Sequence, residues 1–137
     1  MSLSLYRLAD QLRRPRINTG ERGEDIAHRW LRSRGFTVVA RNWRPPEGGG
    51  ELDIVAWERD ELVFVEVKAR LSNLSAPERA IDPDKIRALR RAARAYVRRA
   101  LPHGAEPQES NEETRIRFDV VTIFGNEVDH LRDAFPF

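Results

Sequence analysis

The chain has 137 residues, of which 40% are hydrophobic and 34% are charged, and its formal net charge at neutral pH is +2. This length and composition predict one folded domain with a hydrophobic core and exclude a disordered chain. The absence of cysteine excludes disulfides, thiolate nucleophiles and cysteine-based zinc sites, and it fits a cytoplasmic location. No apolar run approaches the length of a membrane span, so we expect no membrane partner.

The first part of the chain is predicted to lead into a helix. Residues 1–17 lack the apolar core of a secretory signal, and we expect them to be a flexible lead-in to a single domain over residues 18–137. Residues 18–35 have the pattern of an amphipathic helix. Asn18 begins a capping-box spacing, and Gly35 suits the position that follows the last helical turn.

Three strands are predicted next. Residues 36–42 (FTVVARN) have the composition of a strand, and residues 44–50 (RPPEGGG) form a turn-rich break that we expect to move. Two apolar runs, 51–57 and 62–68, flank a short charged turn, which is typical of a β-hairpin. The sheet is therefore expected to begin with an antiparallel meander.

The second half adds one helix and at least one strand. Asp82 can cap a helix that has Pro83 at its first position and that continues to residue 101. Residues 102–114 are acidic and contain proline, so we expect a flexible loop. Residues 115–124 (RIRFDVVTIF) form a strand, and a short extended piece follows. The order α-β-β-β-α-β predicts an α/β or α+β domain.

Two carboxylates fall inside the predicted hairpin strands. If the turn is centred on Arg59 and Asp60, Asp53 lies opposite Glu66, with Cβ atoms about 5 Å apart. Such close like charges repel, so either one carboxyl group holds a proton with a raised pKa, or a cation such as Mg²⁺ lies between them. Lys68 shares the face of Glu66 and can reach the same region.

These residues also have an ordinary structural interpretation. Carboxylates near strand ends are commonly solvated, and Glu51 could form a cross-strand ion pair with Lys68. Glu24 lies at the edge of the inward arc of the first helix, where it can lean toward the sheet as a third carboxylate. Taken alone, a glutamate in a first helical turn is explained by the helix dipole.

The acidic residue on the first helix, followed by Asp, a hairpin turn and Glu-x-Lys, resembles the active-site pattern of the PD-(D/E)xK nuclease superfamily. The successive blocks GERGEDIAHRWLRSRGFTVVARNWR, GELDIVA, LVFVEVKAR, AIDPDKIRALRRAA and RFDVV are similar to the YraN-like family of bacterial proteins, which is related to archaeal Holliday-junction resolvases. The resemblance covers roughly residues 18–135. It implies a restriction-endonuclease-like fold, in which helices flank a central mixed β-sheet that contains the antiparallel meander.

The resemblance also implies an activity and roles for residues. Asp53 and Glu66 would ligate Mg²⁺ or Mn²⁺, and Glu24 would complete the shell. Lys68 would orient or help deprotonate the attacking water. The implied protein is a metal-dependent endonuclease that hydrolyses DNA, including branched or partly single-stranded DNA, and a homodimer would suit a junction that is cut twice. The segment PPEGG departs from the family because it is longer and lacks the usual basic residue.

The second predicted helix offers a surface for a polyanion. We expect its basic side chains to contact phosphates of a nucleic acid, with the residue nearest the helix start also able to face the site. These residues are Lys85, Arg87, Arg91, Arg94 and Arg98. The alternatives are a solvated face that the acidic loop partly neutralises and, for the whole chain, a nucleic-acid-binding or assembly protein with the same fold and little turnover.

Three further residues have two interpretations each. Trp43 could stack on a base or pack under the adjacent loop. Asp119 could take part in catalysis, or it could serve strand packing or bind a basic partner. His28 lies near Glu24 but is better explained as a partly exposed helix residue than as a metal ligand.

Overall fold

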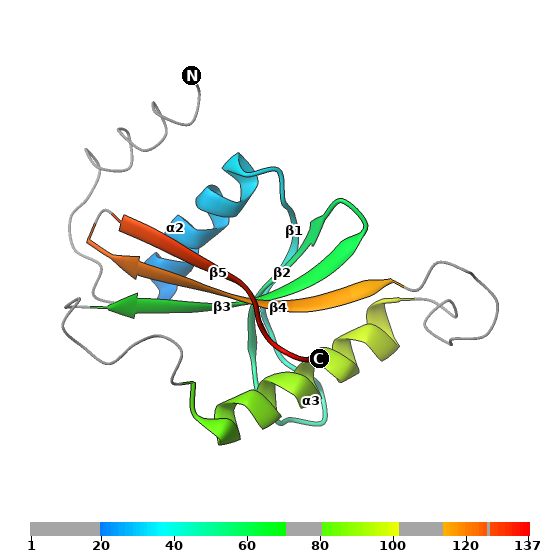
Figure 1. Ribbon diagram of the computed structural model, residues 1–137. Helices are drawn as coiled ribbons and strands as arrows, with labels where there is room; N and C mark the ends of the chain where they lie inside the picture. The colour runs from blue at the N-terminus through cyan, green and yellow to red at the C-terminus, as the bar shows by residue number, and fades with distance from the viewer. Residues whose placement is uncertain (1–19, 71–80, 102–113, 126) are drawn as a thin grey trace.

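The computed structural model describes residues 20–70, 81–101, 114–125 and 127–137. Two helices and five strands occur in this part of the chain (Figure 1). They are α2 (Gly20–Ser33), β1 (Thr37–Trp43), β2 (Leu52–Glu58), β3 (Glu61–Arg70), α3 (Pro83–Ala100), β4 (Arg115–Phe124) and β5 (Glu127–Phe135). Three predicted features lie outside the described residues: the lead-in over residues 1–17, the helix cap Asn18 and nearly all of the acidic segment 102–114.

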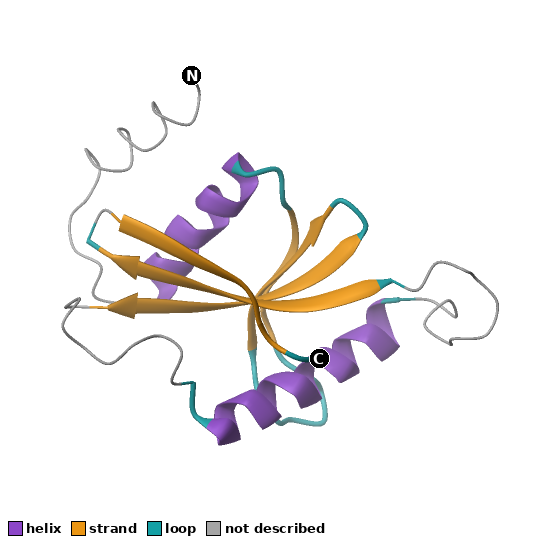
Figure 2. Ribbon diagram, viewed as in Figure 1, coloured by secondary structure: helices purple, strands orange, loops and turns teal. Residues whose placement is uncertain are grey.

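The five strands form one open mixed sheet in the order β1-β2-β3-β4-β5. All neighbouring pairs are antiparallel except β3 and β4, which are parallel because α3 lies in the crossover between them. The two helices lie on opposite sides of the sheet (Figure 2). The fold is therefore α+β and consistent with a restriction-endonuclease-like fold. Neither described helix has the length and apolar character needed to cross a membrane.

Alternation along the strands gives the sheet a hydrophobic core on each face. The α2-side core joins three helix residues (Ile26, Ala27 and Leu31) to inward residues of the strands such as Val63 and Val65. The α3-side core joins Leu89, Ala92 and Ala93 to Val55, Leu62, Phe64 and Phe118. Each fully buried large side chain contributes about 1.5–3 kcal/mol to folding. The two cores hold both helices firmly against the strands that carry the acidic residues.

The helix ends follow the predicted signals. Gly35 has φ +93°, its N–H donates to the carbonyl of Arg32, and the N–H of Phe36 donates to the carbonyl of Leu31. This pair of bonds is a Schellman motif, which ends α2. At the start of α3, the Asp82 side chain accepts a hydrogen bond of 2.9 Å from the N–H of Asp84. The predicted caps Gly35 and Asp82 are confirmed.

The predicted hairpin register is confirmed for the paired part of β2 and β3, which ends at Ile54 and Val65, one position before the predicted opposition of Asp53 and Glu66. Val55 pairs with Phe64, and Trp57 pairs with Leu62, so the turn is formed by Arg59 and the residue that follows it. Arg59 has φ +56°, a left-handed conformation that tight hairpin turns need. The predicted short C-terminal piece is longer than expected, because β5 has nine residues and forms an edge of the sheet.

Candidate metal centre and nucleic-acid interface

The candidate site lies where the pairing of β2 with β3 stops. The paired positions end at Ile54 and Val65, and beyond them the Asp53 side chain accepts a 2.9 Å hydrogen bond from the backbone N–H of Val67. The regular alternation of β2 also breaks here, because Leu52 packs in the same α3-side core as Val55. The Asp53 carboxylate therefore stands in the ladder position where a backbone carbonyl would otherwise accept.

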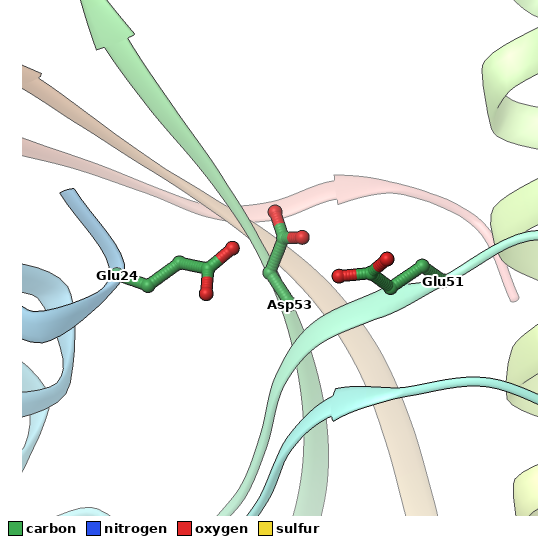
Figure 3. Close-up of side chains that lie close together, drawn as sticks. All are labelled: Glu24, Glu51 and Asp53. Atoms are coloured by element: carbon green, nitrogen blue, oxygen red, sulfur yellow. The ribbon is translucent and has the colours of Figure 1, made fainter. Parts of the chain in front are cut away.

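Three carboxylates from different parts of the chain converge at this point (Figure 3). They are Glu24 in the first turns of α2, Glu51 directly before β2, and Asp53 in β2. One oxygen of each lies within 4.8 Å of the others. Glu24 leans toward the sheet as predicted. Glu51 was not predicted as a member of this group.

Two glycines allow the chain to approach closely beside these acids. A Cβ atom at Gly23 would lie 3.3 Å from the Cβ of Ala69, so the start of α2 rests directly on β3 next to Glu24. Gly50 has φ +104°, and a Cβ there would lie 2.7 Å from the carbonyl oxygen of Ala88. The loop before β2 therefore lies against α3, and this contact fixes the position of Glu51.

Glu66 adjoins Asp53 but does not belong to the group of three within 4.8 Å. Its side chain is 9% exposed, and its Oε1 lies 3.5 Å from Nζ of Lys85. Its Oε2 is buried and has no hydrogen-bond partner among the described residues. Burial, and then the charge of Asp53, raise the pKa of Glu66 to about 7. Burial also raises the pKa of Asp53, although the hydrogen bond from Val67 opposes that rise.

The outer carboxylates of the site each have a basic neighbour. Nη2 of Arg41 lies 3.9 Å from Glu24, and Nη2 of Arg44 lies 2.6 Å from Glu51. Burial and the charge of Asp53 raise the pKa of Glu24, while a hydrogen bond from Asn42 and the charge of Arg41 lower it. Asn42 has φ +52°, a left-handed conformation that asparagine tolerates better than most residues.

The alternative ion pair between Glu51 and Lys68 is wrong, because Arg44 binds Glu51 instead. Lys68 is half-buried on β3, where it pairs in register with Thr122 of β4. By alternation it shares the face of Glu66, two residues before it. Within the part of the chain that the structure describes, no carboxylate lies within ion-pair distance of the Lys68 ammonium group. That group is thus available for an anion.

The described residues fit a hard divalent cation. Mg²⁺ and Mn²⁺ bind oxygen ligands, and Glu24, Glu51 and Asp53 supply carboxylate oxygens from three sides. The Oε2 atom of Glu66, buried without a hydrogen bond, needs either a proton or a cation. The sequence signal for Glu51 was its place two residues before Asp53, but strict alternation assigned it to an ion pair at the strand end.

The predicted basic face on α3 is exposed but partly neutralised by the protein itself. Arg87 pairs with Asp84, and Arg98 lies 3.9 Å from Glu47 of the PPEGG segment. Arg91 and Arg94 are exposed and form no ion pair with any described residue. These two arginines remain the cations of the predicted face that a phosphate chain could meet without displacing an ion pair, whereas Lys85 at the helix start already pairs with Glu66.

The remaining candidates belong to the hydrophobic core or to structural networks. Trp43 packs edge-on against Tyr96 of α3, with ring centroids 5.3 Å apart, and joins the α3-side core. His28 is half-buried, burial lowers its pKa, and it is not a member of the carboxylate group.

Asp119 has the basic partners that its second interpretation required. It is fully buried, accepts a 2.8 Å hydrogen bond from Nε of Arg117 and lies 2.7 Å from Nε2 of His130. Burial alone would raise its pKa, but the hydrogen bonds from His130 and Arg117 lower it to about 2. Asp119 pairs in register with Val65 of the α2-side core, so it lies on the opposite face of the sheet from Glu66.

Comparisons with known proteins assign most of the chain to one family. Residues 23–123 match the model of "Uncharacterised protein family UPF0102". A UPF0102 protein of Solibacter usitatus is 47% identical over 137 residues, covering 96% of this chain and 97% of the relative. UPF0102 proteins of Koribacter versatilis (40% identity; 87% of this chain, 80% of the relative) and Desulfosudis oleivorans (41%; 85% and 88%) are also similar.

Proposed function

Because the chain belongs to the uncharacterised protein family UPF0102, as its YraN-like motifs predicted, we propose from the chemistry of its site that it is a metal-dependent endonuclease. Its substrate would be DNA, and the resemblance to Holliday-junction resolvases favours branched or partly single-stranded DNA. One observation carries the proposal. Carboxylates of Glu24, Glu51 and Asp53 converge within 4.8 Å, beside a Glu66 that is 9% exposed and has an oxygen without a hydrogen bond.

The site residues divide the work of phosphodiester hydrolysis between them. Asp53 and Glu66, with Glu24 and Glu51, would hold Mg²⁺ or Mn²⁺, which supplies a Lewis acid for the phosphoryl oxygen and acidifies a bound water. The backbone N–H of Val67 fixes the orientation of Asp53. The Lys68 ammonium group, on the face of Glu66, would orient the attacking water and offset the charge that develops on the phosphate.

Helix α3 provides the surface for the rest of the substrate. Its exposed arginines lie on the same side of the sheet as Glu66, because Leu62 and Phe64 on that face pack against this helix. A phosphate backbone along Arg91 and Arg94 would lead to the acidic site through Lys85, whose ammonium group adjoins Glu66. Binding through such contacts is salt-dependent and independent of base sequence.

The proposal is tested by incubating the protein with plasmid, single-stranded and four-way-junction DNA in Mn²⁺, Mg²⁺ or EDTA. We expect cleavage only with a divalent ion, and its loss in Asp53→Asn, Glu66→Gln and Lys68→Met. Asp129→Asn removes an exposed carboxylate on β5 and is the matched control, which should cleave like the wild type. Cleavage that persists in Asp53→Asn, or in EDTA, would sink the proposal.

One observation favours a second candidate, a nucleic-acid-binding or assembly protein with little turnover. The basic neighbours of the site's carboxylates (Arg41, Arg44 and Lys85) already offset part of the acidic charge without any metal. A protein of this kind would bind DNA in EDTA, and Glu66→Gln would leave that binding unchanged. Salt-sensitive binding without metal-stimulated cleavage of any of the three DNA forms would favour it over the endonuclease.

A further inference from the structure

A lysine from α3 reaches the carboxylates at the end of the β2–β3 pairing. Nζ of Lys85 lies 3.5 Å from Oε1 of Glu66, while the Lys85 side chain remains 47% exposed. Burial raises the pKa of Asp53 as well as that of Glu66, and the charge of Lys85 opposes both rises. The ammonium group therefore acts on both acids. The Asp82 cap fixes the helix turn that carries it.

Lys85 differs from the two arginines that neighbour the other acids. Arg41 lies 3.9 Å from Glu24 but binds the exposed Asp25 at 2.8 Å, and Arg44, itself 75% exposed, binds Glu51, which keeps contact with solvent. The partner of Lys85 is the nine-tenths buried Glu66, whose second oxygen has no hydrogen bond. A positive charge at Glu66 is therefore worth more than at the exposed Arg44–Glu51 pair, because solvent screens it less. The Lys85 ammonium group thus contacts the same Glu66 carboxyl group to which a divalent ion would bind.

We propose that Lys85 is the resident counter-cation of the Asp53–Glu66 pair and competes with the divalent ion for it. This inference rests on the proposed function, because it requires a divalent ion to bind these carboxylates. An ion on Glu66 would repel an ammonium group at 3.5 Å. The half-exposed Lys85 side chain is flexible and can turn into solvent, so Lys85 is a positioning residue that sets how tightly the ion is held.

The test is a titration of the full chain with Mg²⁺ near pH 8.5, in which binding is measured by calorimetry and by the rise in melting temperature. Lys85→Met removes the competing charge, and we expect the Kd for Mg²⁺ to fall about tenfold, as for the loss of a charge-assisted contact. Lys85→Arg keeps the charge and should keep nearly the wild-type Kd. Arg87→Met removes a charge from the same end of α3, where Arg87 binds Asp84, and should leave the Kd unchanged.

Four results would overturn the inference. Equal gains in Lys85→Met and Arg87→Met would mean that only the net charge of α3 matters. Weaker Mg²⁺ binding by Lys85→Met would mean that the lysine supports the ligands instead of competing. A Kd that is the same in Lys85→Met as in a wild type that binds Mg²⁺ would remove the role of Lys85 alone. A wild type that binds no Mg²⁺ would remove the metal centre as well.

Discussion

Asp53 stands at the centre of the acidic group, so neutralising it should stabilise the metal-free protein. Asp53→Asn removes one charge but keeps a side-chain oxygen to accept the hydrogen bond from Val67. The substitution leaves the shape of the site nearly unchanged. The expected result is a protein that unfolds less readily in EDTA and no longer responds to a divalent ion.

The size of the effect follows from the distances in the site. One oxygen of Asp53 lies within 4.8 Å of an oxygen of Glu24 and of Glu51. Two unit charges about 5 Å apart repel by roughly 0.8 kcal/mol in water and roughly 3 kcal/mol at an effective dielectric constant near 20. Arg41 and Arg44 offset part of this repulsion. We therefore expect Asp53→Asn to raise the free energy of unfolding by about 1–2 kcal/mol, and the melting temperature by about 3–8 °C.

Urea unfolding in EDTA near pH 8.5, where Glu66 with its pKa of about 7 is ionised, measures the effect. Asp53→Ala is the comparison, because it removes the same charge but also the bond to Val67, which costs about 1 kcal/mol. Melting curves with and without Mg²⁺ complete the assay. The reasoning is refuted if Asp53→Asn is less stable than the wild type in EDTA, or if Mg²⁺ still raises its melting temperature by the wild-type amount.

Three further predictions concern the buried Asp119, the glycine loop before β2 and the exposed arginines of α3. The pKa of Asp119 is lowered from 3.8 to about 2, so this carboxylate stabilises the fold above pH 4 by roughly 2–3 kcal/mol, a contribution that is lost as the pH falls through 2. Asp119→Asn should lose at least that much in urea unfolding at pH 7, and its difference from the wild type should shrink between pH 4 and pH 2. The Cβ atom of Gly50→Ala would lie 2.7 Å from a backbone oxygen of α3, so this variant should lose about 1–3 kcal/mol of stability and bind Mg²⁺ more weakly. Gly48→Ala is its control, because a Cβ atom there has nothing within 4 Å. It should lose about 1 kcal/mol of stability and bind Mg²⁺ like the wild type. The double variant Arg91→Ala and Arg94→Ala should reduce the slope of log K against log salt by about 2, measured by fluorescence anisotropy of a short duplex in EDTA.

The part of the site that alternation governs could be predicted from the sequence. The register of β2 and β3 follows from an even turn, so the opposition of Val55 to Phe64 fixed which residues come near Asp53. The inward lean of Glu24 followed from helical periodicity, since Ile26, Ala27 and Leu31 define the buried face of α2. Regular elements repeat their geometry, and that repetition makes such positions predictable.

Glu51 could not be placed in the same way, because the backbone is irregular on both sides of it. The loop before it turns through three glycines of positive φ, and the strand after it breaks alternation at Leu52. On the neighbouring strand, Asn42 is left-handed at the same level of the sheet. Each irregularity changes the direction of the neighbouring side chains, and the periodicity of the sequence does not predict that change. The sequence therefore left open a strand-end ion pair with Lys68, where the structure has a carboxylate turned toward Asp53.

The same irregularity gives the acidic group its chemical use. In an unbroken ladder, neighbouring side chains of β2 alternate between the two cores, and Glu24 from the α2 side could not meet acids that face α3. The end of the pairing at Ile54 leaves Asp53 between the two faces, where it adjoins Glu24 and Glu66 together. The charge of Asp53 thus raises the pKa of Glu24 on one side and the pKa of Glu66 on the other. Neutralising Asp53 should therefore uncouple Glu24 from Glu66, which substitution of either glutamate alone would not do.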